Sequence, residues 1–172
     1  MTITAGVDIG STATKALVLK DQQIIGFAIR PTGANPENAA NLALQSAIES
    51  SRIKMEDIQF IVSTGYGRRS FSKANEQLNE INANVRASVW LGSSAGTIRT
   101  IIDIGGQDSK VIALDKDGVV KDFMMNDKCA AGTGKFLEVI AQLLEVDLKE
   151  MGQISLATTH PIKIASTCVV FA

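Results

Sequence analysis

Two stretches of the chain share one pattern: residues 7–15 read VDIGSTATK, and residues 102–110 read IDIGGQDSK. Shifting the sequence by 95 positions lays the first Asp-Ile-Gly on the second, and Lys15 on Lys110. Chance readily matches apolar residues, but it rarely matches an Asp-Ile-Gly together with a lysine in register. The pattern therefore indicates a duplicated unit of strand, turn, strand and strand, with an aspartate near the end of each first strand.

Outward from the first stretch, apolar runs predict four strands, at residues 3–9, 16–19, 24–29 and 60–62. Asn35 followed by Pro36 and Glu37 predicts the start of a helix, with Asn35 as its cap. The core face of this helix would be formed by Leu44, Ala47 and Ile48. Residues 70–95 show no clear element, and we expect helical turns near 85–91.

The second copy continues differently. The shift lays Ile24-Ile25 on Val119-Val120, which predicts the third strand of this copy. Thr133 can cap a helix with apolar residues at helical spacing from Phe136 to Leu144. After Asp147 we expect a turn and then strands, at 162–164 and 169–171. Because the repeat is unfinished at Ala172, we expect the chain to be a fragment of a longer protein.

Each turn carries residues suited to phosphate. Gly10 lets the backbone approach a ligand, and exposed turn amides with the hydroxyls of Ser11, Thr12 and Thr14 can donate to phosphate oxygens. Lys15 adds positive charge, and aspartates at positions 8 and 103 can hold Mg²⁺ or orient water. Alternatively, both stretches are tight hairpins with Asp and Gly for turn geometry. The duplication favours phosphate binding over this alternative.

Other nucleotide motifs are absent from the sequence. There is no Gly-x-Gly-x-x-Gly after a strand, and residues 132–135, GTGK, are not a P-loop. Cys129 stands where such a loop opens with glycine, and Phe136 stands where Ser or Thr would bind Mg²⁺. With a single histidine, there is no basis for a multi-histidine zinc site.

Cys129 and Cys168 are the only cysteines of the chain. Cys168 lies in an apolar run and fits a buried structural residue, whereas Cys129 lies between a lysine and a glycine-rich segment. A 4Fe-4S cluster needs about four thiolates, so two chains would have to share one. Spacing alone leaves the structural and the cluster interpretation open.

Composition limits the class of protein. The 172 residues include 17 Lys plus Arg and 18 Asp plus Glu, for a net charge of -1. This balance disfavours nucleic-acid binding and attachment to a membrane surface, both of which use clustered positive charge. No apolar run approaches the roughly 20 residues of a membrane span, and no signal peptide is recognisable. We therefore expect a cytoplasmic protein that binds neither nucleic acid nor membranes.

The paired hairpins resemble those of the acetate kinase, sugar kinase, heat-shock chaperone and actin superfamily. A closer resemblance is to the activator ATPases of 2-hydroxyacyl-CoA dehydratases, grouped with the ATPase subunits of benzoyl-CoA reductase. Five motifs in order carry this resemblance: Asp8–Ala13, Thr64–Arg68, Asp103–Asp108, Asn126–Gly134 and Ser166–Ala172. It implies an α/β actin-like ATPase fold of duplicated ribonuclease-H-like domains, at 1–97 and 98–172, with the second incomplete.

The resemblance also implies a site and partners. ATP or ADP with Mg²⁺ would be bound, and one 4Fe-4S cluster would be held per homodimer by Cys129 and Cys168 of each chain. An electron from ferredoxin or flavodoxin would pass to a dehydratase or reductase component, driven by ATP hydrolysis. Asp8, Asp103 and Gln107 would be catalytic, with both aspartates near Mg²⁺ through water. The phosphate contacts would come from Gly10, Ser11, Thr12, Ala13, Thr14, Lys15, Gly105, Gly106 and Gln107, with Thr133 close by.

Two departures from the family pattern stand out. Members commonly carry Ser-Cys-His-Ala before the second hairpin, where this chain has residues 80–85, EINANV. The difference removes neither expected cluster ligand but leaves the acyl-CoA substrate open. The chain also stops before the expected adenosine-binding glycine turn, so we expect it to bind ATP poorly alone. Two other functions stay open: a small-molecule kinase of the same fold, and a nucleotide-binding module without turnover, each with structural cysteines.

Overall fold

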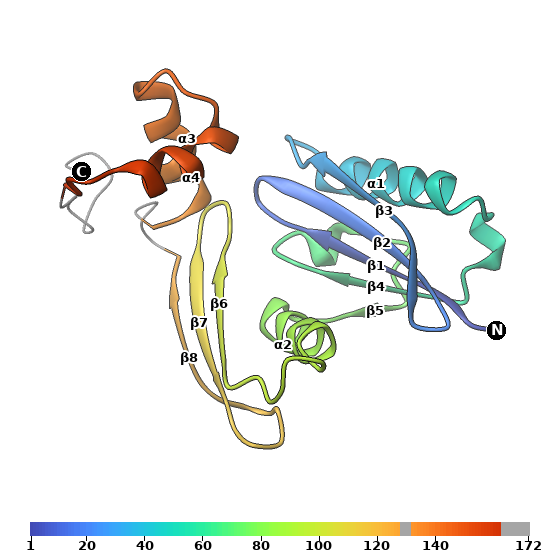
Figure 1. Cartoon of the computed structure of the whole chain (residues 1–172). Coiled ribbons are helices and arrows are strands. Elements are labelled where there is room, and N and C mark those ends of the chain that lie inside the picture. Colours follow the sequence, from blue (N-terminus) through green and yellow to red (C-terminus); the bar gives the residue numbers. More distant parts are fainter. Residues whose placement is uncertain (128–131, 163–172) are drawn as a thin grey trace. The chain divides into compact units, whose positions relative to one another are not determined.

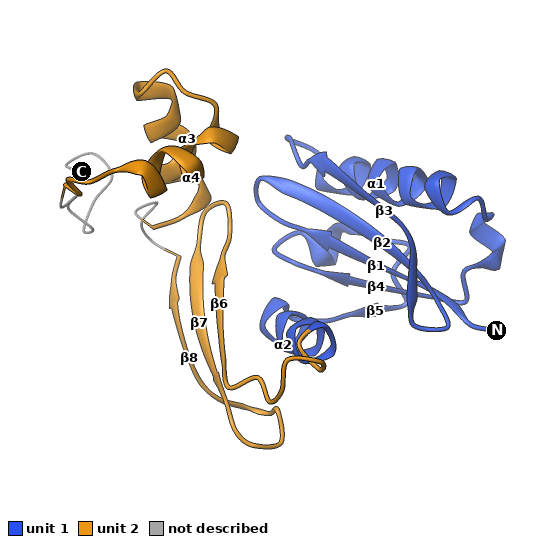
Figure 2. Cartoon of the chain, in the orientation of Figure 1, with its two compact units in different colours: residues 1–91 blue, residues 92–172 orange. Residues whose placement is uncertain are grey.

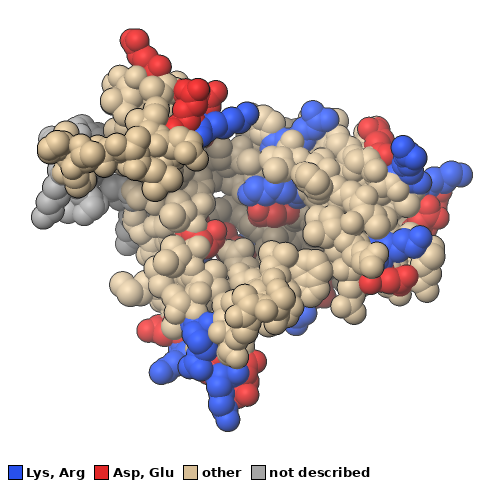
Figure 3. Space-filling view, viewed as in Figure 1, with Lys and Arg blue, Asp and Glu red and all other residues tan. Residues whose placement is uncertain are grey.

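A computed structural model describes residues 1–127 and 132–162 of the chain. The chain divides into two compact units, Met1–Leu91 and Gly92–Ala172, which are coloured separately in Figure 2. Within the described residues, no helix is both long and apolar enough to cross a membrane. Figure 3 shows Lys and Arg interspersed with Asp and Glu on the face that it presents.

The first unit is built on a five-stranded sheet with the order β3-β2-β1-β4-β5 (Figure 1). Strands β1 to β3 form an antiparallel meander, and β4 pairs parallel to β1. The four strands predicted from the sequence are confirmed, with longer bounds for the second, third and fourth. The five strands are β1 Ile3–Ile9, β2 Ala13–Lys20, β3 Gln23–Pro31, β4 Phe60–Thr64 and β5 Glu76–Gln77.

Helix α1, Pro36–Ser51, packs against β1, β2 and β3. As predicted, Asn35 is its cap: the side chain accepts a hydrogen bond from the Asn38 amide at 3.0 Å. The predicted core residues Leu44, Ala47 and Ile48 are all buried. The unit also contains two short 3-10 turns and a second helix, longer than the helical turns expected there. These elements are η1 Met55–Asp57, η2 Arg68–Ser70 and α2 Glu80–Leu91.

The second unit begins with an antiparallel sheet in the order β6-β7-β8, followed by two helices. Its elements are β6 Thr100–Ile104, β7 Ser109–Leu114, β8 Val120–Asn126, α3 Gly134–Leu143 and α4 Leu148–Ala157. The predicted helix after Thr133 is confirmed. Where only a turn was expected after Asp147, the structure has α4, whose first turn is capped by the Asp147 side chain. The strands predicted at 162–164 and 169–171 fall, apart from residue 162, outside the described residues.

The internal repeat is present in the backbone. Asp8 pairs with Lys15 across β1 and β2, and Asp103 pairs with Lys110 across β6 and β7. The pairing between the second and third strands shifts at Val18/Leu19 in one copy and at Ala113/Leu114 in the other, which are equivalent positions. Two hairpins therefore share both their register and the place of their irregularity.

The third strands are offset by one residue. Leu19 pairs with Ile24, whereas the equivalent Leu114 pairs with Val120. The prediction that Ile24 matches Val119 is therefore wrong by one position. The physical reason is the connection between the strands, because the turn that begins at Asp115 in the second copy holds one residue more than the turn after Lys20.

Candidate functional site

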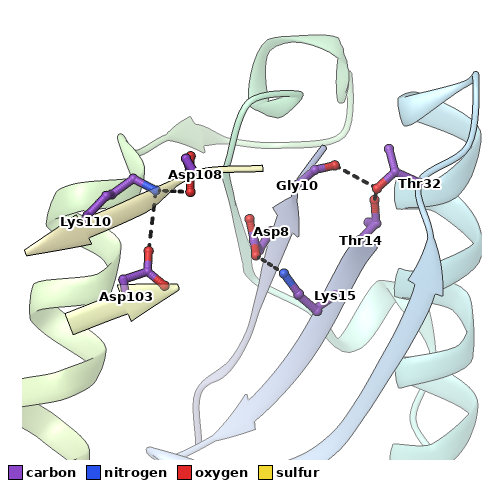
Figure 4. Close-up of polar contacts among 8 residues, drawn as sticks. All are labelled: Asp8, Gly10, Thr14, Lys15, Thr32, Asp103, Asp108 and Lys110. Carbon is purple, nitrogen blue, oxygen red and sulfur yellow. Dashed lines mark hydrogen bonds and ion pairs between the residues drawn. The ribbon is translucent and has the colours of Figure 1, made fainter. Parts of the chain in front are cut away.

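The turn after β1 is held in place by hydrogen bonds within the turn and from Thr32, the residue that follows β3. The Gly10 amide donates to the Ala13 carbonyl at 3.1 Å, and the Thr32 hydroxyl donates to the Gly10 carbonyl at 2.7 Å. The Thr14 hydroxyl lies 2.9 Å from that of Thr32, and Thr14 is fully buried (Figure 4). Thr14, which was also predicted as a phosphate ligand, thus supports the turn from the core side, whereas the predicted ligands Ser11 and Thr12 are exposed.

Asp8 and Lys15 form an ion pair beside this turn. Lys15 Nζ lies 2.9 Å from Asp8 Oδ2, and the two side chains are 49% and 38% exposed, respectively (Figure 4). An exposed ion pair adds little to stability, because water solvates both charges well when they separate. The Lys15 ammonium can therefore leave Asp8 for another anion at small cost, as a phosphate-binding lysine must.

A loop from β4 lies directly against Asp8. Asp8 pairs with Thr64 in the parallel register, and a Cβ placed on Gly65 would lie 2.5 Å from Asp8 Oδ1. Gly65 also has φ +85°, so the loop needs glycine for both space and conformation. The Gly67 amide donates to the Ile9 carbonyl at 2.9 Å, which fastens the loop to β1.

Thr64 was not among the predicted site residues. Its hydroxyl oxygen is buried and has no hydrogen-bond partner among the residues that the structure describes, although Thr64 pairs with Asp8 across the strands. A buried hydroxyl without a partner is costly, which favours a water or ligand atom beside it. The signal in the sequence was the Thr-Gly at the end of a strand parallel to β1, readable only once the strand order was known.

The turn after β6 repeats the backbone of the first turn with different side chains. The Gly105 amide donates to the Asp108 carbonyl at 2.8 Å, the equivalent of the Gly10–Ala13 bond. Lys110 Nζ lies 2.8 Å from Asp108 Oδ1 and 3.5 Å from Asp103 Oδ2 (Figure 4). Lys110 and Asp108 were not predicted as site residues, although the repeat had already matched Lys110 to Lys15.

Helix α3 begins on this second turn. The Gly134 amide donates to the Gly105 carbonyl and the Lys135 amide to the Gly106 carbonyl, each at 2.9 Å. Thr133 is the predicted N-cap residue and is fully buried, but its hydroxyl does not make the capping bond. The turn carbonyls instead satisfy amides that the start of a helix leaves without intrahelical partners.

The predicted site residues therefore gather in two groups. Asp8 and residues 10–15 lie together in the first unit, and Asp103, residues 105–107 and Thr133 belong to the second. The predicted ligands Cys129 and Cys168 lie outside the described residues. In the part of the chain that the structure describes, no three His, Cys, Asp or Glu side chains gather as a metal site.

Both hairpins have an aspartate near the end of the first strand and a glycine in the turn, and they belong to an α/β chain of the actin-like ATPase fold. The family resemblance of the motifs is confirmed: the chain belongs to the BadF/BadG/BcrA/BcrD ATPase family, whose model matches residues 5–172. It is 47% identical over 170 residues to the activator of lactoyl-CoA dehydratase of Anaerotignum propionicum. That match covers 98% of this chain and 64% of the relative.

Two solved structures resemble the chain along nearly its whole length. The (R)-2-hydroxyglutaryl-CoA dehydratase component A of Acidaminococcus fermentans has a TM-score of 0.90 and 37% identity, covering 99% of this chain and 65% of that one. The 2-hydroxyisocaproyl-CoA dehydratase activator of Clostridium difficile, with bound ADPNP, has a TM-score of 0.88 and 41% identity. It matches 99% of this chain and 62% of its own. This chain thus spans less than two thirds of these relatives.

Proposed function

We propose that the protein is an ATP-hydrolysing iron-sulfur activator that transfers a low-potential electron to a 2-hydroxyacyl-CoA dehydratase. A benzoyl-CoA reductase is the other acceptor class in this proposal. The observation that carries it is the pair of glycine turns, each with an aspartate and a lysine in the same register, in a chain of this ATPase family. Its relatives are named as dehydratase activators, which favours the dehydratase as partner.

The first turn fits a phosphate and Mg²⁺. A Cβ at position 10 would lie 2.8 Å from the Ala13 carbonyl oxygen, so the tight turn needs glycine there. Lys15 would exchange its exposed partner Asp8 for a phosphate oxygen, and Asp8 would then be available to Mg²⁺ through water. The Thr64 hydroxyl would form a hydrogen bond with that water, as donor or as acceptor. Bound Mg²⁺ would supply charge neutralisation on the phosphates.

In the second turn, Asp103 would contact Mg²⁺ through water and orient the attacking water, and Gly105, Gly106 and Gln107 would approach the phosphates. Positioning and charge complementarity do most of the work in phosphoryl transfer, so both turns must hold their geometry. The hydrogen bonds from the start of α3 to the carbonyls of Gly105 and Gly106 support this role, because they fix the turn.

The cysteines would hold the redox centre. Two thiols per chain supply half of a Cys₄ set, so one 4Fe-4S cluster per homodimer fits the donor chemistry, with Cys129 and Cys168 from each chain. Ferredoxin or flavodoxin would be the electron donor. Reduced thiols are typical of the cytoplasm, where we place the protein.

Helix α3 is linked to the second glycine turn by hydrogen bonds and to the cysteine segment by its nearness in sequence. Helix α3 starts five residues after Cys129, and its first amides are bonded to the second turn. A shift of that turn on hydrolysis would therefore move the start of α3. This supports a coupling in which nucleotide state alters the surroundings of the cluster.

The test uses the protein purified and reconstituted without oxygen. We expect about four irons per dimer, as Cys₄ ligation requires, together with Mg²⁺-dependent ATP hydrolysis. Cys129→Ser and Cys168→Ser should each lose the iron and its visible absorption while keeping nucleotide binding. An iron-free, colourless dimer that still hydrolyses ATP would instead identify an ATPase or kinase with structural cysteines.

A further inference from the structure

The two lysines of the repeat occupy different environments, although their backbones are equivalent. Lys15 is 49% exposed and contacts Asp8 alone among the ion pairs of its hairpin, whereas Lys110 is 3% exposed and contacts two carboxylates. The additional carboxylate comes from Asp108, which stands where the first copy has Ala13. The difference between Ala13 and Asp108 in the repeat thus accompanies the burial of Lys110.

Burial fixes the Lys110 ammonium in place. Its closest carboxylate, Asp108, is itself only 7% exposed, and the two atoms are 2.8 Å apart. If the ammonium left for a phosphate, Asp108 would remain as an unpaired buried charge, which is strongly unfavourable. Lys110 is therefore not suited to follow a phosphate group, as Lys15 can.

Asp108 is in turn held by the glycine turn. A Cβ on Gly105 would collide with Asp108 Oδ1, so the carboxylate occupies the space that any other residue at 105 would need. The backbone carbonyl of Asp108 accepts the Gly105 amide at 2.8 Å. The carboxylate that holds Lys110 is thus built into the same turn that would face the phosphates.

Asp103 is the member of this cluster that reaches solvent. Its side chain is 31% exposed, and its Oδ2 lies 3.5 Å from Lys110 Nζ, longer than a strong hydrogen bond but well within electrostatic range. We infer that Lys110 and Asp108 are positioning residues: together they hold a fixed positive charge that orients the Asp103 carboxylate toward the nucleotide. This inference rests on the proposed ATP hydrolysis at that site.

The test compares single and double variants of the protein. Lys110→Met leaves the buried Asp108 carboxylate unpaired, and Asp108→Leu removes the carboxylate 2.8 Å from the buried Lys110 ammonium, so each single variant should lower the Tm. The double variant Lys110→Met/Asp108→Leu removes both charges, and an apolar pair of similar size commonly restores stability. The polar double variant Lys110→Gln/Asp108→Asn serves the same purpose where the apolar pair does not recover the Tm. Lys116→Met, on the exposed turn between β7 and β8, is the matched control.

Two readouts separate positioning from structure: kcat and KM for MgATP, and ADPNP affinity with Mg²⁺ and with EDTA. A stable double variant should keep its metal-free affinity, lose the gain in affinity that Mg²⁺ gives, and fall about 10- to 100-fold in kcat. Lys116→Met should match the wild type. A double variant with wild-type Tm, kcat and Mg²⁺ response would show that Lys110 and Asp108 do not position Asp103, and it would overturn the inference. Absence of hydrolysis in the wild type would instead overturn the proposed function, while the Mg²⁺ response still tests the positioning.

Discussion

The two hairpins of this chain share their backbone geometry but differ in the burial of their lysines. Both close a glycine turn with the same amide-to-carbonyl bond, and both place a lysine opposite an aspartate. In the first hairpin that pair is exposed, and in the second the lysine is buried against Asp108. Duplication has kept the geometry that can approach a phosphate, while side-chain burial decides which lysine can move.

The sheets that carry the hairpins differ as well. Val7 of β1 is 1% exposed in the first unit, where α1 packs on the sheet, whereas the equivalent Ile102 of β6 is 70% exposed. The same row of the repeat is therefore core in one unit and surface in the other. Equivalent positions in a repeat do not have equivalent energies, and substitutions can measure the difference.

The largest effect is expected from removing the buried lysine. Lys110→Met leaves Asp108 as an unpaired buried charge and should cost about 3–5 kcal/mol of unfolding free energy. Its counterpart Lys15→Met removes an exposed pair and should cost less than about 1 kcal/mol. Hydrogen exchange of the amides of β1–β3 and of β6–β8 measures the stability of each unit. Equal losses for the two variants would show that the hairpins are energetically alike.

A second comparison concerns the glycines of the turns. Gly105→Ala pushes a Cβ into Asp108 Oδ1 and should cost about 1–3 kcal/mol through displacement of the buried pair. In an Asp108→Ala background that collision is removed, so Gly105→Ala should add much less to the loss already caused by Asp108→Ala. Double-mutant cycles by denaturant unfolding measure this coupling. In the first turn a Cβ on Gly10 would meet the Ala13 carbonyl instead, so the cost of Gly10→Ala should not depend on Asp108→Ala. Additive losses for Gly105→Ala and Asp108→Ala would show that Asp108 is not the obstacle at Gly105.

The third prediction measures the two sheet faces. Val7→Ala removes about two buried carbon groups and should cost about 1.5 kcal/mol. Ile102→Ala in the 172-residue chain should be nearly neutral, because its side chain is largely in water already. A cost for Ile102→Ala close to that of Val7→Ala would contradict the difference in burial between the two positions.

Local signals and the repeat were enough to predict most of this architecture. The strands around both turns, the cap at Asn35 and the helix after Thr133 each have a short-range cause, and the duplication supplied two observations of one unit. Helix α4 was missed because Gly152 interrupts an irregular apolar pattern, although Asp147 followed by Glu150 is a helix-start signal. The third strand of the second copy was misplaced by one residue because a longer turn does not change the apolar pattern.

The site was less predictable for a physical reason. Whether a lysine is exposed depends on residues that pack around it from other strands, so Lys15 and Lys110 look alike in the sequence. The position of the buried Thr64 hydroxyl next to Asp8 likewise cannot be predicted until β4 is known to lie parallel to β1. Residue type and spacing predict phosphate binding, which stays a prediction, but only the fold distinguishes the exposed Lys15 from the buried Lys110.

The smallest effect is expected where the helices begin. Helix α1 is capped by a side chain, since Asn35 Oδ1 accepts the Asn38 amide at 3.0 Å, so Asn35→Ala should cost about 1 kcal/mol of unfolding free energy. Asn35→Asp keeps an acceptor at this position and is the matched control, with little expected loss.

The first amides of α3 are bonded instead to the carbonyls of the second turn, so the start of α3 depends on the geometry of that turn. Hydrogen exchange should therefore show Asn35→Ala loosening only α1, whereas Gly105→Ala loosens the start of α3 together with its own turn. If Gly105→Ala left the amides of Gly134 and Lys135 fully protected, the turn and the helix would not be coupled, and the link proposed between nucleotide and cysteine segment would lose its structural basis.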